Sequence, residues 1–357
     1  MRHHSVLVLI LLSFLLGCPK PPENSSSIEN ALFALDHVQV PATYTVVDVS
    51  KQSKLDAVET TATTNLSCTK LGAFYWEIGD GTGAFGYSSV NGTVNQTTSL
   101  LIASASKWIW GAYVLEKVGT PGTNEQFYLR MQSGYDNVQD NKCNVTTVNS
   151  CFTNGPGRDG TNNNNFQHTG DENKFYYNGG HFQAYAALNP SALTPALTTY
   201  DRTQLTSEIA NVVLGGANPD FFYATPQLAG GVQTTPQVYA LFLQRILNSN
   251  LTISSYLGAD TVPTLPALHP SQALYSPFTT GINKEDVHYS YAHWLEDSPQ
   301  SDSSYSSPGK FGFYPWIDSS GTTYGILARY STSALAYAES VYCGRLLRTA
   351  YNTGVAQ

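Results

Sequence analysis

The sequence predicts an α/β (α+β) protein with an antiparallel sheet built from the N- and C-terminal segments. Helices flank this sheet, and a mostly helical subdomain is inserted between its two parts. Patterns of two strands joined by a turn lie near both ends of the chain, at 72–90 and 311–330, and helical patterns lie between them. About 330 residues follow the N-terminal leader, which is long enough for one large domain with an insertion or for two small ones.

The first residues predict export and a lipid anchor. An apolar run from Val6 to Leu16 follows Arg2 and is too short to cross a bilayer as a helix. The run leads into Gly17-Cys18, and the segment resembles the bacterial lipobox, whose cysteine is lipidated and becomes the new N-terminus. We therefore expect a signal peptide at 1–17 and a lipid on Cys18. An ordinary secretory signal with a chance cysteine is the alternative.

The segment after Cys18 predicts where the anchor sits. Residues 18–40 begin rich in proline and serine, which is typical of a flexible tether. Lys20 favours the outer membrane, by resemblance to the sorting rules of bacterial lipoproteins. We expect an exported protein that is bound to a bacterial membrane through this anchor.

The composition excludes some classes of protein. The chain is 41% hydrophobic and 12% charged, with 23 tyrosines and 29 glycines, which suits an exported globular protein better than a disordered one. Its net charge of −8 argues against nucleic acid as a partner.

Four cysteines remain if Cys18 is lipidated, and an oxidising compartment favours disulfides between them. Cys143 and Cys151 lie close together in an Asn/Thr-rich segment and are expected to form a local bridge. Cys68 and Cys343 would then tie the two ends of the domain together. Metal ligation by these cysteines is less favoured, because the chain has no Cys-x-x-Cys pair.

Several elements follow in order along the chain. The pattern at 72–90 predicts a hairpin, and its glycines at 81, 83 and 86 belong to a turn rather than a dinucleotide fingerprint, because a strand follows them. Helices are expected at 104–118 and 237–247, and 154–171 is expected to be a surface loop.

The C-terminal part completes the expected sheet. A second hairpin is expected from 311–318 and 322–330, followed by an amphipathic helix at 333–349. We expect the domain to span 41–357, with sheet segments at about 70–100 and 285–350 and a helical insertion at about 105–284. The segment from His288 to Trp294 is expected to be one further strand of the sheet.

The spacing Ser-x-x-Lys points to nucleophilic catalysis, but it occurs three times: Ser67/Lys70, Ser104/Lys107 and Ser307/Lys310. Only Ser104/Lys107 opens a predicted helix, where a spacing of three places both side chains on one face. A lysine can take the serine proton only if burial or nearby positive charge lowers its pKa. Context therefore favours Ser104 as nucleophile and Lys107 as base over an unremarkable helix start.

An ordered set of further segments makes the chain resemble the serine β-lactamase-related and penicillin-binding-protein family. The segment around Ser104 and Lys107 is similar to the family's nucleophile helix, and Ser133-Gly134 resembles a segment that follows that helix. Tyr176-Tyr177-Asn178 is similar to the motif Tyr-x-Asn, and Ala229-Gly230-Gly231 to a turn before a later helix. The resemblance covers about residues 70–350 and implies a β-lactamase/transpeptidase-like fold.

The resemblance also implies roles for individual residues. Tyr176 would share the Ser104 proton with Lys107 and pass it to the leaving group, and Asn178 would orient Lys107 and bind substrate. The third motif is best matched by Ser307-Pro308-Gly309. Its position implies that Ser307, Gly309 and Gly312 lie at the substrate, and that the N–H groups of Lys310 and Ser104 form the oxyanion hole.

The third motif departs from the family because its first residue, Ser307, is not basic. Binding of a substrate carboxylate, and with it β-lactam chemistry, is therefore less expected. We expect a serine hydrolase that forms an acyl-enzyme on a small ester, peptide or β-lactam-like substrate, as an esterase or a D-alanyl peptidase does. Two alternatives stay open: a weak or inactive lipoprotein that binds cell-envelope ligands, and a purely structural surface lipoprotein.

No cofactor or metal is expected from the sequence. His288 and His293 have acidic neighbours, yet their spacing fits no helical i,i+4 pair and His-Glu-x-x-His is absent. Gly-x-Ser-x-Gly is also absent, which argues against an α/β-hydrolase.

Overall fold

A computed structural model describes residues 44–189, 191–279, 285–299 and 301–357. The expected signal peptide, Cys18 and the tether lie outside the described residues. Within them, no helix is both long enough and apolar enough to cross a membrane.

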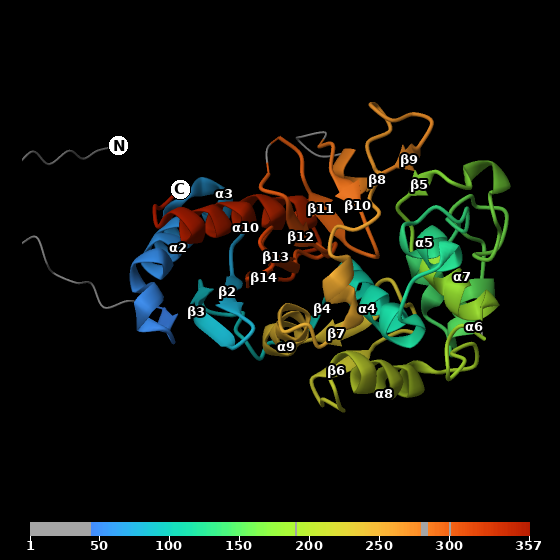
Figure 1. Cartoon of the computed structure of the whole chain (residues 1–357), viewed down its shortest axis with the longest axis horizontal. Coiled ribbons are helices and arrows are strands. Elements are labelled where there is room, and N and C mark those ends of the chain that lie inside the picture. Colours follow the sequence, from blue (N-terminus) through green and yellow to red (C-terminus); the bar gives the residue numbers. More distant parts are fainter. Residues whose placement is uncertain (1–43, 190, 280–284, 300) are drawn as a thin grey trace, which may run out of the picture. The chain divides into compact units, whose positions relative to one another are not determined.

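The main sheet confirms the predicted antiparallel architecture (Figure 1). Its order is β1-β3-β2-β14-β13-β12-β11-β10-β8, and β14 pairs with β2 from Thr323 opposite Asp80 to Ala328 opposite Tyr75. The first and last thirds of the chain are thus joined at the centre of the sheet. The strands are β1 Thr45–Val46, β2 Phe74–Asp80, β3 Gly83–Val90, β8 Val262–Pro263, β10 His288–Tyr289, β11 Trp294–Glu296, β12 Ser304–Ser306, β13 Tyr314–Ile317 and β14 Thr323–Ala328.

Both predicted hairpins are confirmed, as β2/β3 and β13/β14. In the second turn the Asp318 carboxylate accepts hydrogen bonds from the N–H groups of Thr322 and Thr323, each at 2.8 Å, as Asp does in turns. The single strand expected at 288–294 is wrong. Two short strands, β10 and β11, pair there across a turn in which Ala292 has a φ of 60°.

Helices cover both faces of this sheet. Helices α2 (Gln52–Thr64) and α10 (Ala336–Thr353) pack together on one face, and α9 (Pro236–Leu247) packs on β14 from the other (Figure 1). Gly344 of α10 lies directly against the rings of Tyr314 and Trp316, where a Cβ would be within 2.5 Å of Tyr314. Gln244 of α9 donates to the Tyr324 hydroxyl at 3.2 Å.

The disulfides confirm both predicted pairings. Cys68, in α3 (Leu66–Thr69), is bridged to Cys343 in α10, and Cys143 is bridged to Cys151 in α6 (Val148–Thr153). The first bridge joins the two terminal segments of the domain beside the sheet, so these segments are covalently linked.

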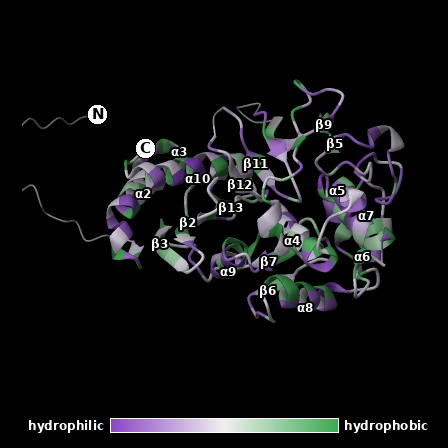
Figure 2. Cartoon of the chain, viewed as in Figure 1, coloured by the Kyte–Doolittle hydropathy of each residue, from purple (hydrophilic) through white to green (hydrophobic). Residues whose placement is uncertain are grey.

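The inserted region is helical but also contains strands. Helices α4 and α9 confirm the helices expected at 104–118 and 237–247, while two small sheets and β8 depart from a mostly helical insertion. Figure 2 shows hydrophobic and hydrophilic residues together on these helices; α9 has one buried face, whereas α4 is buried all round from Ser106 to Leu115. The remaining helices are α4 Ser106–Val118, α5 Thr123–Leu129, α7 Gly180–Leu188 and α8 Arg202–Val213, and the strands are β4 Leu100–Leu101, β5 Phe175–Tyr176, β6 Phe221–Tyr223, β7 Val232–Thr234 and β9 Ala273–Tyr275. Short 3-10 helices are η1 Val49–Lys51, η2 Ala103–Ala105, η3 Asp140–Cys143, η4 Thr169–Asp171, η5 Thr252–Tyr256 and η6 Pro277–Thr279.

Candidate active site

Ser104 lies in η2, immediately before α4, and lines a cavity of about 850 Å³. Ala103 precedes it with a φ of 45°, a left-handed conformation that costs a non-glycine residue about 1–2 kcal/mol. Strain of this kind persists where the surrounding structure fixes it, and it is concentrated at functional sites. Neither Ser67 nor Lys70 lines this cavity.

Lys107 faces Ser104 across one helical turn. Its Nζ donates to Oγ of Ser104 at 3.0 Å and to the Ala229 carbonyl at 2.9 Å. The side chain is buried, and burial lowers the pKa of Lys107 to about 8, although the Asp140 carboxylate acts in the opposite direction. A substantial fraction of Lys107 is therefore neutral at mildly alkaline pH and able to accept a proton.

The tyrosine at this pair is Tyr177, not Tyr176. The Tyr177 ring centroid lies 4.8 Å from Nζ of Lys107. Burial raises the pKa of Tyr177 above its ordinary value, and the polar side chains of Ser104 and Trp294 oppose that shift. The Tyr176 ring instead lies 4.2 Å from the guanidinium of Arg158. The expectation for Tyr176 is corrected by one position, because β5 ends at Tyr176 and the following residue turns toward Ser104.

Asn178 does not orient Lys107 through a recorded contact. Its Nδ2 donates to the Val138 carbonyl at 3.0 Å, and its Oδ1 accepts from the Gly180 N–H at 2.7 Å at the start of α7. The expected role in orienting Lys107 is therefore corrected: besides Ser104, the polar partner of Lys107 Nζ is the carbonyl of Ala229, in the turn Ala229-Gly230-Gly231. Asn178 still lines the cavity.

The third motif lies beside Ser104, as expected. Ser307 Oγ donates to the Ser104 carbonyl at 3.0 Å, and a Cβ on Gly309 would come within 2.1 Å of the Ile102 carbonyl oxygen. Lys310 lines the cavity with Ser104. Ser307, Gly309 and Gly312 do not line it, so the assignment of these three residues to substrate binding is corrected; Gly312 packs against Arg329 and Ser340.

The cavity combines apolar walls with a few polar groups, which is typical of a small-molecule site. Asp140 and Gln227 face each other there, with Nε2 of Gln227 donating to Asp140 Oδ1 at 2.6 Å. The lining residues are Ala103, Ser104, Lys107, Val138, Gln139, Asp140, Arg158, Tyr176, Tyr177, Asn178, Gly179, Gln227, Ala229, Gly230, Tyr275, Pro277, Phe278, Trp294, Pro308, Lys310, Phe311, Ala334, Leu335 and Tyr337.

Sequence reasoning missed Tyr177, Asp140, Gln227 and Arg158. Tyr177 adjoins the residue that was chosen, and no residue pattern distinguishes two neighbouring tyrosines. Asp140 begins the short 3-10 helix η3, and Gln227 and Arg158 lie in irregular segments; the approach of all three to Ser104 depends on tertiary contacts. For Arg158 the one available signal is a charged residue within a loop otherwise rich in glycine and asparagine.

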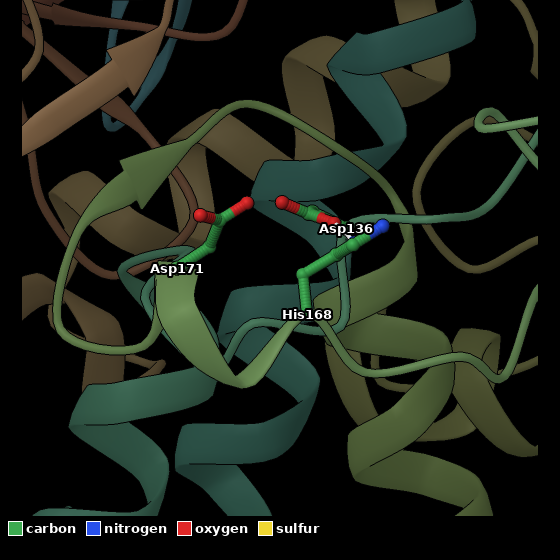
Figure 3. Close-up of side chains that lie close together, drawn as sticks. All are labelled: Asp136, His168 and Asp171. Carbon is green, nitrogen blue, oxygen red and sulfur yellow. Dashed lines mark hydrogen bonds and ion pairs between the residues drawn. The ribbon is translucent and has the colours of Figure 1, made fainter.

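Asp136, His168 and Asp171 form a cluster near the cavity with the spacing of metal ligands (Figure 3). Asp136 is fully buried and pairs through Oδ1 with His168 and with Arg158 at 2.9 Å. Its other oxygen points toward Asp171 and has no recorded partner. The Arg158 guanidinium already offsets the charge of Asp136, so the described contacts require no ion.

The side chains near His288 and His293 are divided among separate contacts. His293 is buried between the Tyr291 carbonyl and the Gly258 N–H, and His288 pairs with Asp297. Glu285 and Glu296 bind Arg345 of α10. These histidines and glutamates therefore serve internal packing in the described structure.

Solved structures show that the chain has the β-lactamase/transpeptidase-like fold. A putative β-lactamase from Bacteroides dorei matches with a TM-score of 0.57 and 15% identity over 84% of this chain and 98% of that one. The D-amino acid amidase of Ochrobactrum anthropi matches with a TM-score of 0.58 and 10% identity over 84% and 99%. EstCE1, a hydrolase with promiscuous acyltransferase activity, matches with a TM-score of 0.57 and 10% identity over 85% and 100%. No protein-family model and no curated protein sequence matches the chain.

Proposed function

We propose that this protein is a serine hydrolase in which Ser104 attacks an ester or amide carbonyl. The observation that supports this most directly is the hydrogen bond from buried Lys107 to Ser104, in a cavity large enough for a small substrate. Neutral Lys107 accepts the Oγ proton as Ser104 bonds to the carbonyl carbon. The same proton then goes to the leaving group as the acyl-enzyme forms, and water releases the acid.

Tyr177 is proposed to take part in this proton transfer, because its side chain adjoins both Ser104 and Lys107. The start of α4 favours the alkoxide that develops on Ser104. The N–H groups of Ser104 and Lys310 are proposed as the oxyanion hole, supported by the position of both residues at the cavity. Export and lipid attachment at Cys18 remain part of the proposal, and Cys18→Ser is expected to abolish metabolic labelling by palmitate.

One labelling experiment tests the enzyme proposal. The purified protein is treated with a fluorescent fluorophosphonate and with a fluorescent penicillin, alongside Ser104→Ala, Lys107→Ala and the matched control Ser67→Ala. We expect covalent labelling of the wild type and of Ser67→Ala, and none of Ser104→Ala. Labelling by fluorophosphonate alone indicates an esterase, and labelling by penicillin indicates a peptidase or β-lactamase. If neither reagent labels the folded wild type, a binding lipoprotein without turnover becomes the better interpretation.

A further inference from the structure

Arg158 brings a cation to the cavity from a segment that the sequence predicts to be only a surface loop. It lies between α6 and η4 and lines the same cavity as Ser104. The third motif, which begins with uncharged Ser307, belongs to the segment between β12 and β13. The cation and the third motif therefore enter the cavity from different parts of the fold.

The guanidinium of Arg158 is held in place by several contacts. Its Nε donates to the Asp136 carbonyl at 2.9 Å, and Nη2 donates to Oδ1 of the buried Asp136 carboxylate at 2.9 Å. The guanidinium lies 4.2 Å from the ring centroid of Tyr176, itself a cavity residue. The Arg158 N–H also donates to the Asn137 carbonyl at 2.8 Å. A guanidinium fixed on one edge and one face loses little entropy when it binds a ligand.

One edge of Arg158 stays available. The recorded hydrogen bonds of its side chain in the described structure use Nε and Nη2, which leaves Nη1 for a ligand, and 34% of the side chain is exposed. Besides Arg158, the cavity contains the cation Lys310 and one carboxylate, Asp140, in the form in which Lys107 is neutral. Its charge thus favours an anionic substrate, and a planar guanidinium suits a carboxylate better than a neutral group.

We propose that Arg158 is a specificity residue that binds a carboxylate of the substrate, with Asp136 and Tyr176 as its positioning residues. The proposal rests on the proposed hydrolase function and specifies its substrate class: esters or amides that bear an acidic group. A purely structural Arg158 that only fastens its loop to Asp136 is the competing interpretation, and it predicts no dependence on substrate charge.

Two pairs of esters of matched size test the proposal. Para-nitrophenyl hexanoate and mono-para-nitrophenyl adipate differ by a carboxylate on the acyl side, and phenyl and meta-carboxyphenyl hexanoate differ by one on the leaving side. For each pair the ratio of kcat/KM, charged over neutral, is measured in the wild type, Arg158→Gln, Arg158→Lys and the matched control Arg202→Gln. Arg202 is exposed at the start of α8 and does not line the cavity.

We expect Arg158→Gln to lower the ratio about 10–100-fold in at least one pair, as loss of a charged hydrogen bond does. Arg158→Lys should retain part of the wild-type ratio, and Arg202→Gln should retain all of it. If Arg158→Gln leaves both ratios within twofold, the proposal is overturned, whatever its effect on melting temperature. Calorimetry with adipate and adipamide distinguishes a failure of the carboxylate-binding proposal from a failure of the hydrolase proposal. If the protein hydrolyses nothing, adipate binding that is lost in Arg158→Gln supports the anion site alone, and equal binding of both compounds rejects it.

Discussion

Lys107 and Ser104 are joined by a hydrogen bond of 3.0 Å, and the lysine is buried while the serine faces the cavity. This arrangement affects the protonation state of Lys107. A lysine in water is protonated at neutral pH and accepts no proton, whereas burial here lowers the pKa of Lys107 to about 8. The Asp140 carboxylate opposes this lowering of the pKa, and the Tyr177 ring and the Ala229 carbonyl contact the Lys107 side chain.

The first prediction concerns pH. In the proposed mechanism neutral Lys107 is the base, so kcat/KM for a neutral ester should rise with pH and level off above about 8. Asp140 raises the pKa of Lys107 electrostatically, so Asp140→Asn should lower that pKa and move the rising limb to lower pH. Exposed Asp220 offers a matched control, and Asp220→Asn should leave the limb unchanged. A limb that moves to higher pH in Asp140→Asn would contradict the assignment of Lys107 as base.

The second prediction separates the two neighbouring tyrosines. Tyr177→Phe should lower kcat about 10–1,000-fold while the melting temperature changes little, because the ring is kept and only the hydroxyl is removed. Tyr176→Phe should retain most of the activity toward a neutral ester, since its ring lies on Arg158 rather than on Lys107. Steady-state kinetics on both variants is the measurement. A larger loss of kcat in Tyr176→Phe would restore the assignment made from the sequence.

Local patterns predicted the fold better than the site. Clear turn residues separate the strands of both hairpins, β2/β3 and β13/β14. Helix α9 has a periodic apolar face, and α4 is a largely apolar segment that ends at Gly119, so each could be predicted from its own segment. Helix α2 was not predicted, because Gln52–Thr64 includes four threonines and its stability depends on packing against α10. Ser104 and Lys107 were predicted because one helix turn brings them together.

The rest of the site depends on long-range contacts. Asn178 was expected to orient Lys107, yet its amide satisfies backbone groups of Val138 and Gly180. Arg158 reaches the cavity only because buried Asp136, 22 residues earlier, holds its guanidinium. No spacing along the chain encodes such a contact, so sequence patterns predict the nucleophile and miss the residues that surround it.

The third prediction concerns the close approach of the third motif to the nucleophile. A Cβ at Gly309 would lie 2.1 Å from the Ile102 carbonyl oxygen, so Gly309→Ala must push apart the segments on which Lys310 and Ser104 lie. We expect a loss of stability of about 1–3 kcal/mol and slower labelling by fluorophosphonate. Gly216→Ala is the control, because a Cβ there meets no atom within 4 Å. Labelling at the wild-type rate in Gly309→Ala would show that this contact does not position Ser104.

The last prediction compares the two disulfides. The Cys68–Cys343 bridge closes a loop with a sequence separation of 275, and Cys143–Cys151 closes one of only 8. Closing a longer loop removes more entropy from the unfolded chain, so the first bridge should contribute more, within a typical range of about 2–5 kcal/mol. Denaturant unfolding of Cys68→Ala/Cys343→Ala and Cys143→Ala/Cys151→Ala measures both contributions.

The two bridges should also differ in their effect on activity. Cys143 ends η3, which begins at the cavity residue Asp140, whereas Cys68 and Cys343 join α3 to α10 and line no part of the cavity. We expect Cys68→Ala/Cys343→Ala to lose stability but keep the rate of labelling while folded. Cys143→Ala/Cys151→Ala should lose less stability but shift the pH limb, because Asp140 is less firmly placed near Lys107. The opposite pattern, with the short bridge dominating stability, would mean that strain or residual structure outweighs loop entropy.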